Sequence, residues 1–463
     1  MRQYLTSYSV QLLILFSLMM VSLASPAGDG KENPIRTILI GPVHVVLMES
    51  GEVTPGQAVI TRNGLIDSII SYSEAKDRPG TTLVDGENGY LIPGLAEMHA
   101  HIPSQGRGEQ YARDILVLYL ANGITTARGM LGEPWHLELR EKLASQEWMG
   151  PRLITSGPSF NGKTVSSPAQ AARMVRVQAR AGYDFLKLHP GLELEEFEAI
   201  ADAAHKVKLP FAGHVSFAVG LDAALRQHQA SIDHLDSYAQ AMVPEGAPLH
   251  GEAPSFFGIN LAVGMDSNLA PRLAKATAAA GVWNVPTLSL IENLAGERSV
   301  ETLLARPGMV YVSEDLKQVW INHVNSLREQ ASWSDRQRFL MLRRTLIREL
   351  QAAGAGLLLG SDAPQIMNVP GFSIHEELGF MVGSGLTPLQ ALQSGTRNVA
   401  AFFKEEMQGD VKPAYVADLV LLRSNPLENI AATSDILGVM RAGSWYSRED
   451  LDRLLAAIKG RGI

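Results

Sequence analysis

The chain has 463 residues, of which 46% are hydrophobic and 19% are charged, and its formal net charge at pH 7 is -8. This hydrophobic fraction supplies a large buried core and excludes an extended disordered chain. The acidic balance argues against a nucleic-acid partner, which would need a basic surface. Because the sequence has no cysteine, disulfides and thiolate metal ligands are also excluded.

The first residues have the pattern of an export signal. Arg2 precedes an apolar run over residues 12–23, and Ser22 and Ala24 are small residues at the positions that signal peptidase reads. We therefore expect residues 1–24 to be a signal peptide and the protein to be secreted or periplasmic. The run is shorter than the roughly 20 residues that span a bilayer, so we expect no stable membrane insertion after signal removal. A retained anchor is the alternative.

Short strand-like runs lie near both ends of the chain. Residues 36–90 contain β-branched and apolar runs broken by Gly, Pro and Asn, and Asn63-Gly64 is typical of a hairpin turn. Residues 408–448 contain further runs of the same kind. We expect the two ends to assemble one small composite β-sandwich domain.

Between these flanks, residues 91–407 alternate strand and helix patterns. Such alternation is typical of a parallel sheet closed into a barrel, so we predict the α/β class and a (β/α)8 TIM barrel. Long connections over residues 236–280 and 289–334 lie on the side where barrels place substrate walls. The eight candidate strands end near His101, Met130, Gly157, His189, Val215, Leu235, Thr287 and Asp362.

Metal-binding side chains recur at the ends of these predicted strands. His99 and His101 are two apart on a strand, so both point into the barrel and can share one ion. A pair of this kind is weak evidence alone, and each single histidine has a structural role as its alternative. Six groups at one end of a barrel favour a metal centre over chance placement. The six are His99, His101, Lys187, His214, His234 and Asp362.

Lys187 lies among apolar neighbours on the predicted fourth strand. Burial of a protonated lysine is costly and lowers its pKa. A neutral amine can add carbon dioxide and form a carbamate, whose two oxygens could bridge two ions. The alternative is a lysine that pairs with a carboxylate or extends to the rim of the barrel.

Together these motifs resemble the amidohydrolase superfamily, in its imidazolonepropionase-like and Xaa-Pro dipeptidase-like branch. The resemblance covers nearly everything after the signal. It depends on the strand that ends in His-Ala-His, on the lysine strand and on the two histidine-terminated strands. Its other motifs lie at residues 93–101, 122–128, 184–187, 360–363 and 417–421.

The resemblance implies two divalent ions. His99, His101 and Asp362 would bind the more buried ion, and His214 and His234 the more exposed one. Lys187, as an N6-carboxylated lysine, would bridge them. Zinc is the metal we expect first because nitrogen and oxygen ligands suit it, and manganese, cobalt or iron would fit the same donors.

The chain departs from the pattern of this branch in two places. Gly129 follows Arg128 where an acidic or amide residue is expected, and residues 155–163 lack a glycine-histidine segment. Both departures bear on the substrate and leave the metal ligands unchanged.

Four residues are candidates for substrate contact. His189 shares a strand face with Lys187, and Tyr238 begins the long sixth connection. His375 follows the eighth strand, and Arg128 ends the second, where it could hold an anionic group. The alternative is a structural hydrogen bond for His189 and an ordinary loop position for Tyr238. For His375 it is a solvated helix face, and for Arg128 it is a pair with a neighbouring carboxylate.

These features predict an exported binuclear metal-dependent amidohydrolase that cleaves an amide bond in a dipeptide or an N-acyl amino acid. The expected mechanism is attack by a metal-bridging hydroxide with Asp362 as the proton shuttle. The alternatives are a hydrolase of a cyclic amide, lactone or ester, and a metal-bearing protein that only binds a ligand. The expected partner is a small molecule or short peptide, and a homo-oligomer is compatible with the sequence.

Overall fold

The computed structural model describes residues 37–463, and these residues pack as one compact unit. The predicted signal peptide, residues 1–24, lies outside the described residues. Within residues 37–463, no helix combines the length and the apolarity that a membrane crossing needs.

The strands of the described part form three sheets. The largest has seven strands, and the other two, with four and three strands, are parallel. The strands are β1 (Thr37–Val46), β2 (Val53–Arg62), β3 (Leu65–Ser71), β4 (Thr82–Pro93), β5 (Leu95–Ala100), β6 (Ile124–Gly129), β7 (Arg152–Thr155), β8 (Leu186–Leu188), β9 (Phe211–Gly213), β10 (Ser231–Asp233), β11 (Trp283–Val285), β12 (Leu419–Leu422), β13 (Ile436–Arg441) and β14 (Ser444–Ser447).

The helices of the described part follow the strands in alternation over the middle of the chain. They are α1 (Tyr72–Ala75), α2 (Glu109–Ala121), α3 (Trp135–Ala144), α4 (Pro168–Ala181), α5 (Leu194–Val207), α6 (Gly220–Arg226), α7 (Tyr238–Ala241), α8 (Ala270–Ala280), α9 (Leu288–Ala295), α10 (Val300–Leu304), α11 (Glu314–Gln330), α12 (Trp333–Ala352), α13 (Phe372–Gly383), α14 (Pro388–Ser394), α15 (Arg397–Phe403) and α16 (Arg448–Lys459). Short 3-10 helices are η1 (Gln105–Arg107), η2 (Phe256–Leu261), η3 (Ser267–Leu269), η4 (Pro307–Tyr311) and η5 (Ile430–Ser434).

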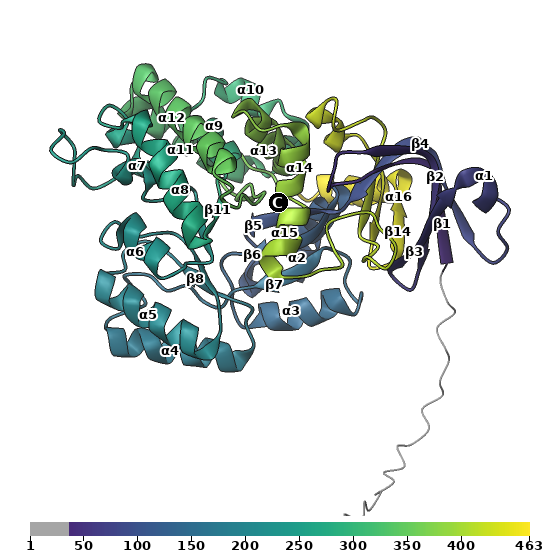
Figure 1. Ribbon diagram of the computed structural model, residues 1–463, viewed down its shortest axis with the longest axis horizontal. Helices are drawn as coiled ribbons and strands as arrows, with labels where there is room; N and C mark the ends of the chain where they lie inside the picture. The colour runs from purple at the N-terminus through teal and green to yellow at the C-terminus, as the bar shows by residue number, and fades with distance from the viewer. Residues whose placement is uncertain (1–36) are drawn as a thin grey trace, which may run out of the picture. The chain divides into compact units, whose positions relative to one another are not determined.

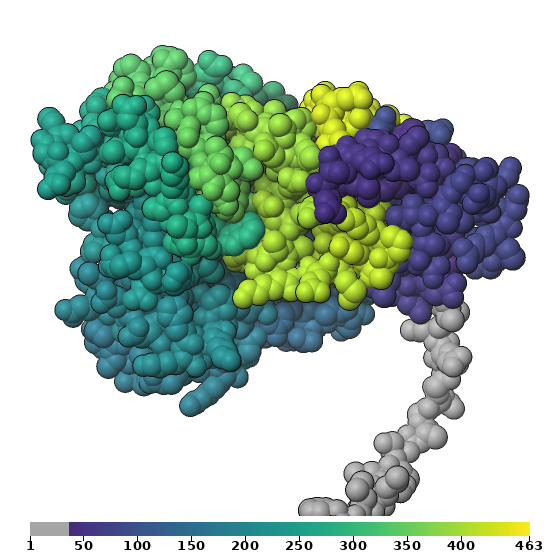
Figure 2. Space-filling view, in the orientation of Figure 1, coloured from purple at the N-terminus to yellow at the C-terminus, as the bar shows by residue number. Residues whose placement is uncertain are grey.

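The seven-stranded sheet is built from both chain ends, in the order β14-β13-β12-β4-β1-β2-β3. Its purple and yellow strands lie side by side in Figure 1, and their atoms adjoin in Figure 2. The expected contribution from both ends is therefore present. A second sheet facing this one is not seen in residues 37–463, so the sandwich form is not shown. The predicted boundaries, 36–90 plus 408–448 around 91–407, stay a prediction.

Strand β12 shows how this sheet joins the rest of the core. Its side chains alternate between the two faces of the sheet, as a strand requires. Leu419 and Leu421 belong to an apolar cluster within the sheet domain. Val420 and Leu422 belong to the main core, together with the helices and parallel strands. Because both faces of β12 are buried, the sheet and the α/β part share one continuous interior.

The parallel strands occupy the predicted middle of the chain. They form the sheets β5-β6-β7 and β11-β10-β9-β8. A bridge from Ser156 to Phe185 joins their edges. The segment before Asp362 completes the series, because Leu357 bridges to Asn284 of β11 and Leu359 O accepts from Met98 N of β5 at 2.8 Å.

Mixed α/β content is confirmed, and seven of the eight predicted strands appear as strands of the structure. The eighth, residues 357–361, is an extended segment with a single bridge. The closed barrel stays a prediction beyond these pairings.

Candidate metal centre

Three metal-binding groups meet at the carboxyl end of β5. The ligand atoms of His99, His101 and Asp362 all lie within 4.8 Å of one another. Asp362 Oδ1 is 2.7 Å from His101 Nε2 and 3.5 Å from His99 Nε2. Two nitrogens and one oxygen at this spacing are a donor set that suits a divalent cation such as zinc.

Two further histidines extend this cluster. His214 directly follows β9 and His234 directly follows β10. Their ring centroids are 4.6 Å apart, and the His234 ring is also 4.6 Å from the His99 ring. The structure therefore brings together the histidines that the sequence placed at separate strand ends.

Left-handed backbone turns aim some of these side chains. His234 has a φ of 60°, and Asp362 has a φ of 66°. Thr287, which contacts His234, has a φ of 48°. Residues with a Cβ rarely adopt this region, and each such residue costs on the order of 1–3 kcal/mol. Strain of this kind, repeated at several strand ends, is typical of a functional site.

The second ring nitrogens of three histidines each lie close to an oxygen of a polar side chain. Asp236 Oδ2 lies 2.7 Å from His214 Nδ1, and Thr287 Oγ1 lies 2.8 Å from His234 Nδ1. Asp233 Oδ2 is 3.0 Å from His99 Nδ1. Metal-binding histidines ordinarily use one nitrogen in this way. The arrangement leaves each Nε2 available for a cation.

Lys187 lies at the centre of β8 and is fully buried. Its Nζ has no hydrogen-bond partner in the described residues, and the carboxylate of Asp233 is 3.6 Å away. Gly213 leaves room for it, since a Cβ there would lie 2.8 Å from Lys187 Cδ. Burial lowers the pKa of Lys187 against the attraction of Asp233 and Asp362. Burial therefore favours the neutral form of this amine.

Asp233 is a buried carboxylate that the sequence analysis missed. It accepts a hydrogen bond from Ser231 Oγ at 2.9 Å, and Arg128 Nη2 lies 3.4 Å from it. Burial raises its pKa, but Arg128 and Lys187 outweigh burial and hold the pKa below its ordinary value. Arg128, expected at the mouth of the site, is 1% exposed and faces Asp233 in the interior. The alternation of β10 from Ser231 could have predicted Asp233.

Glu97 was also missed, although it shares the strand face of His99 and His101. Its Oε1 accepts from His99 N at 3.0 Å and from Ser361 N at 2.8 Å. Burial raises the pKa of Glu97 to about 8. This side chain ties β5 to the segment that carries Asp362, so it positions two candidate ligands at once.

Burial also decides the charge of the histidines. It lowers the pKa of His99 and of His234 well below the ordinary value, with help from neighbouring cations. It lowers the pKa of His189 to about 2. These imidazoles are neutral at pH 7, which is the form that binds a metal.

His189 lies beside the candidate ligand His214, and its substrate contact stays a prediction. Its ring stacks on His214 at a centroid distance of 5.1 Å. It also lines an open recess of about 610 Å³ with Asn161 and Lys163. His189 therefore connects this recess to the candidate ligand His214, although none of the six candidate ligands lines the recess itself.

Tyr238 and His375 have structural partners instead. Tyr238 is 1% exposed, its hydroxyl lies 2.8 Å from Thr277 Oγ1, and burial raises its pKa to about 12. His375 Nδ1 lies 3.1 Å from Thr433 Oγ1. Both side chains have a structural partner in the fold, and their substrate contacts stay a prediction.

An aromatic residue from the long sixth connection covers part of the centre. The ring of Phe257 lies 5.1 Å from the ring of His234 and 4.7 Å from that of Phe256. Phe257 has a φ of 54°, which holds it in a left-handed turn. No sequence pattern singled out this residue because it lies in a loop without periodicity.

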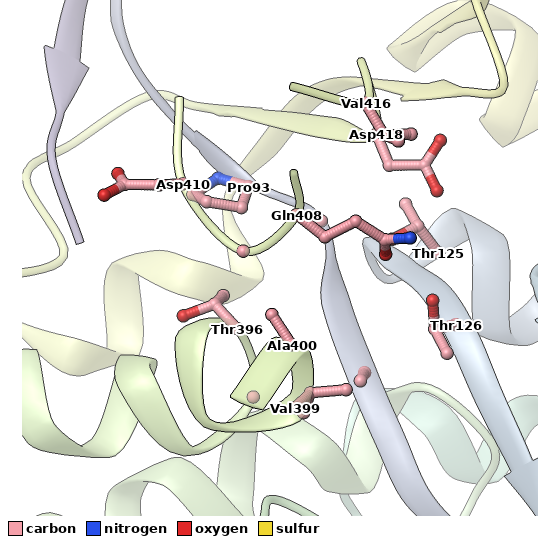
Figure 3. Close-up of a pocket in the computed structure, with 14 residues that line it drawn as sticks. Pro93, Thr125, Thr126, Thr396, Val399, Ala400, Gln408, Asp410, Val416 and Asp418 are labelled. Carbon is pink, nitrogen blue, oxygen red and sulfur yellow. The ribbon is translucent and has the colours of Figure 1, made fainter. Parts of the chain in front are cut away.

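A small cavity lies between the seven-stranded sheet and the parallel strands (Figure 3). Its volume is about 30 Å³, and Thr125, Thr126 and Gln408 are among its lining residues. That space holds a water or two. None of the candidate ligands lines it, so it is not the substrate site.

Comparisons with known proteins agree with this geometry. The model of the amidohydrolase family matches residues 90–446. Ochratoxinase of Aspergillus niger is 23% identical over 478 residues, covering 86% of this chain and 85% of that protein. A 33% identity with adenine deaminase of Rubrobacter xylanophilus spans only 17% of that enzyme and 21% of this chain.

Solved structures show the same fold. Bottromycin amidohydrolase has a TM-score of 0.69 at 24% identity, covering 92% of this chain and 90% of that one. A Xaa-Pro dipeptidase with bound methionine in its active site has a TM-score of 0.63 at 18% identity, covering 89% and 100%.

The metal centre can be tested with two histidine substitutions. His101→Ala removes a group of the three-residue cluster, so we expect the affinity for zinc to fall by at least about tenfold. Elemental analysis after dialysis measures the zinc that stays bound. His375→Ala removes a partly buried histidine outside the cluster and serves as the control, with metal content unchanged. Equal metal content in both folded variants would contradict the assignment.

Proposed function

Because this chain belongs to the amidohydrolase family, we propose that it is an exported hydrolase that uses two divalent metal ions to cleave an amide bond in a dipeptide or an N-acyl amino acid. The observation that carries this proposal is the approach of His99, His101 and Asp362 to within 4.8 Å. The neighbouring rings of His214 and His234 support a second ion beside the first.

The proposed ligand sets follow the resemblance to the amidohydrolase superfamily. His99 and Asp362, which are 1% and 5% exposed, would hold one ion with His101. His214 and His234 would hold the other, and Lys187 would bridge the two as its carbamate. The histidine Nε2 atoms would be ligands in these sets. Lys187 Nζ and Asp362 Oδ1, which are buried without a hydrogen-bond partner in the described residues, also fit a place in the metal centre. Zinc is the proposed metal because the donors are nitrogen and oxygen.

A divalent cation held there would lower the pKa of a coordinated water and polarise the carbonyl of the substrate. Asp362 Oδ1 lies beside His101 Nε2 at 2.7 Å, so this carboxylate is placed at the centre of the cluster. It would accept a proton from the attacking water as the new carbon–oxygen bond forms. It would then donate that proton to the nitrogen as the carbon–nitrogen bond breaks.

The chain's own walls favour a substrate with an apolar or aromatic group. Phe257 covers one side of His234, and Phe256 packs edge-on against Phe257. Lys163 lines the open recess together with His189. An N-acyl amino acid with an aromatic side chain and a free carboxylate would place its ring near Phe257 and its charge near Lys163.

The central test is the substitution Asp362→Asn in metal-loaded protein. We expect normal folding and a fall in kcat of about 10²–10⁴, since general acid–base catalysis contributes a factor of this size. The substrates are N-acetyl-phenylalanine, N-acetyl-glycine and dipeptides, and the phenylalanine derivative should be cleaved fastest.

A chelator should abolish turnover by the wild-type protein, and added zinc should restore it. Wild-type-like activity of Asp362→Asn would refute the proton transfer. Cleavage of lactones or cyclic amides alone would assign a different bond to the same centre.

The proposed carbamate forms when Lys187 Nζ bonds to the carbon of carbon dioxide and releases one proton to solvent. Protein prepared with ¹³C-bicarbonate should show a carbamate carbon by NMR, and Lys187→Arg should not. Lys208→Arg, at an exposed lysine, is the matched control and should keep the signal. Absence of the signal from metal-loaded wild-type protein would contradict carboxylation.

We also propose that residues 1–24 direct export. The apolar run and the small residues at Ser22 and Ala24 support this step. Sequencing of the mature N-terminus after expression should find a chain that begins just after Ala24. Recovery of the intact N-terminus in the cytoplasm would refute it.

A further inference from the structure

A second cavity lies at the opposite end of the parallel strands from the metal centre. Its volume is about 690 Å³, within the range of small-molecule sites. Phe211 and Trp283 line it, and they are the first residues of β9 and β11. The candidate ligand His214, in contrast, follows the last residue of β9. The two sites therefore lie at opposite ends of the same strands.

Aromatic rings form the walls of this cavity. The ring of Phe402 packs edge-on against that of Trp283, with a centroid distance of 5.8 Å. It also packs edge-on against the ring of Phe403, with a centroid distance of 5.0 Å. Phe185 and Phe211 also line the cavity. Such walls favour a ligand with an aromatic or aliphatic body, because flat apolar groups pack well against rings.

Arg128 reaches the inner end of the cavity. Its guanidinium carbon lies 5.5 Å from the ring of Phe185 and 5.3 Å from that of Phe402, and all three residues line the cavity. Its Nε donates to Met98 O at 2.7 Å and its Nη2 to Ser231 Oγ at 3.1 Å. Nη1 has no hydrogen-bond partner in residues 37–463. A buried donor left without a partner is costly.

The rim of the cavity attracts anions. Lys208 and Lys404 line it, are exposed and form no ion pair within the described part of the chain. The carboxylates of the lining, Asp184 and Glu405, are each paired with an arginine, at 3.0 and 2.6 Å. The unpaired charge around the entrance is therefore positive.

We propose that this cavity binds a small carboxylate with an aromatic or aliphatic body. The carboxylate accepts a hydrogen bond from Arg128 Nη1, and the body packs against Phe402 and Trp283. One free donor between two rings suits a carboxylate better than a phosphate, which needs several donors. This site is independent of the proposed hydrolysis, because none of the candidate metal ligands lines it.

The test is calorimetric titration of the metal-loaded protein with 3-phenylpropanoate. We expect a dissociation constant below about 1 mM. The uncharged amide of the same acid should bind at least about tenfold more weakly, because it loses the charge-assisted hydrogen bond. No measurable binding of the acid, or equal binding of the amide, would overturn the proposal.

Variants locate the binding. Ala230 lines the cavity and packs beside Phe185, so Ala230→Phe should fill the space and abolish binding. Ala401→Phe makes the same change at an exposed position of α15 outside the lining and should leave affinity unchanged. Phe402→Leu keeps an apolar side chain and should weaken binding about fivefold.

Asp362→Asn separates the two sites. Undiminished binding of 3-phenylpropanoate to this variant supports a separate cavity even if the proposed hydrolysis fails. Loss of binding in Asp362→Asn, or full binding in folded Ala230→Phe or Phe402→Leu, would instead place the ligand elsewhere and overturn the proposal.

Discussion

The burial of charge among the parallel strands is the constraint on which the site depends. Asp233 is fully buried, and its carboxylate lies near Arg128, Lys187 and His99. An isolated buried carboxylate would be neutralised by its own desolvation. The neighbouring Arg128 guanidinium lowers the pKa of Asp233 against the effect of burial. The same carboxylate therefore lies against a candidate metal ligand and pairs with a buried arginine in an apolar interior.

Arg128 contacts both the buried carboxylate and the second cavity. Its Nη2 donates to Ser231 and Asp233, while its Nη1 has no hydrogen-bond partner in the described residues and lies at the inner end of the aromatic cavity. Removal of either partner of a buried charge pair is far more costly than the pair is worth. The interior of the strands thus links the metal centre at one end with a cationic pocket at the other.

The backbone around the centre is specialised in a second way. Glu97 joins β5 to the segment before Asp362 through backbone donors on both. Left-handed turns at His234 and Asp362 then direct the side chains that follow the strands. The free energy for this strain comes from the surrounding core, which continues into the seven-stranded sheet through Val420 and Leu422.

The sequence by itself determined the α/β class, the order of the strands and the six candidate ligands. Periodicity and strand-end position carry that information. The two-residue spacing of His99 and His101 is visible in the sequence, and the same spacing extends back to Glu97. It likewise indicated that both chain ends are rich in strands.

Only the tertiary structure decided which way the other polar residues face. Arg128, Tyr238 and His375 lie near predicted strand ends or helix starts, yet each contacts a partner distant in sequence. Phe257 reached His234 from a loop without periodicity. Local pattern fixes a side chain's direction only within a regular strand or helix; beyond its last residue, left-handed turns and long-range packing set that direction, and these depend on the whole fold.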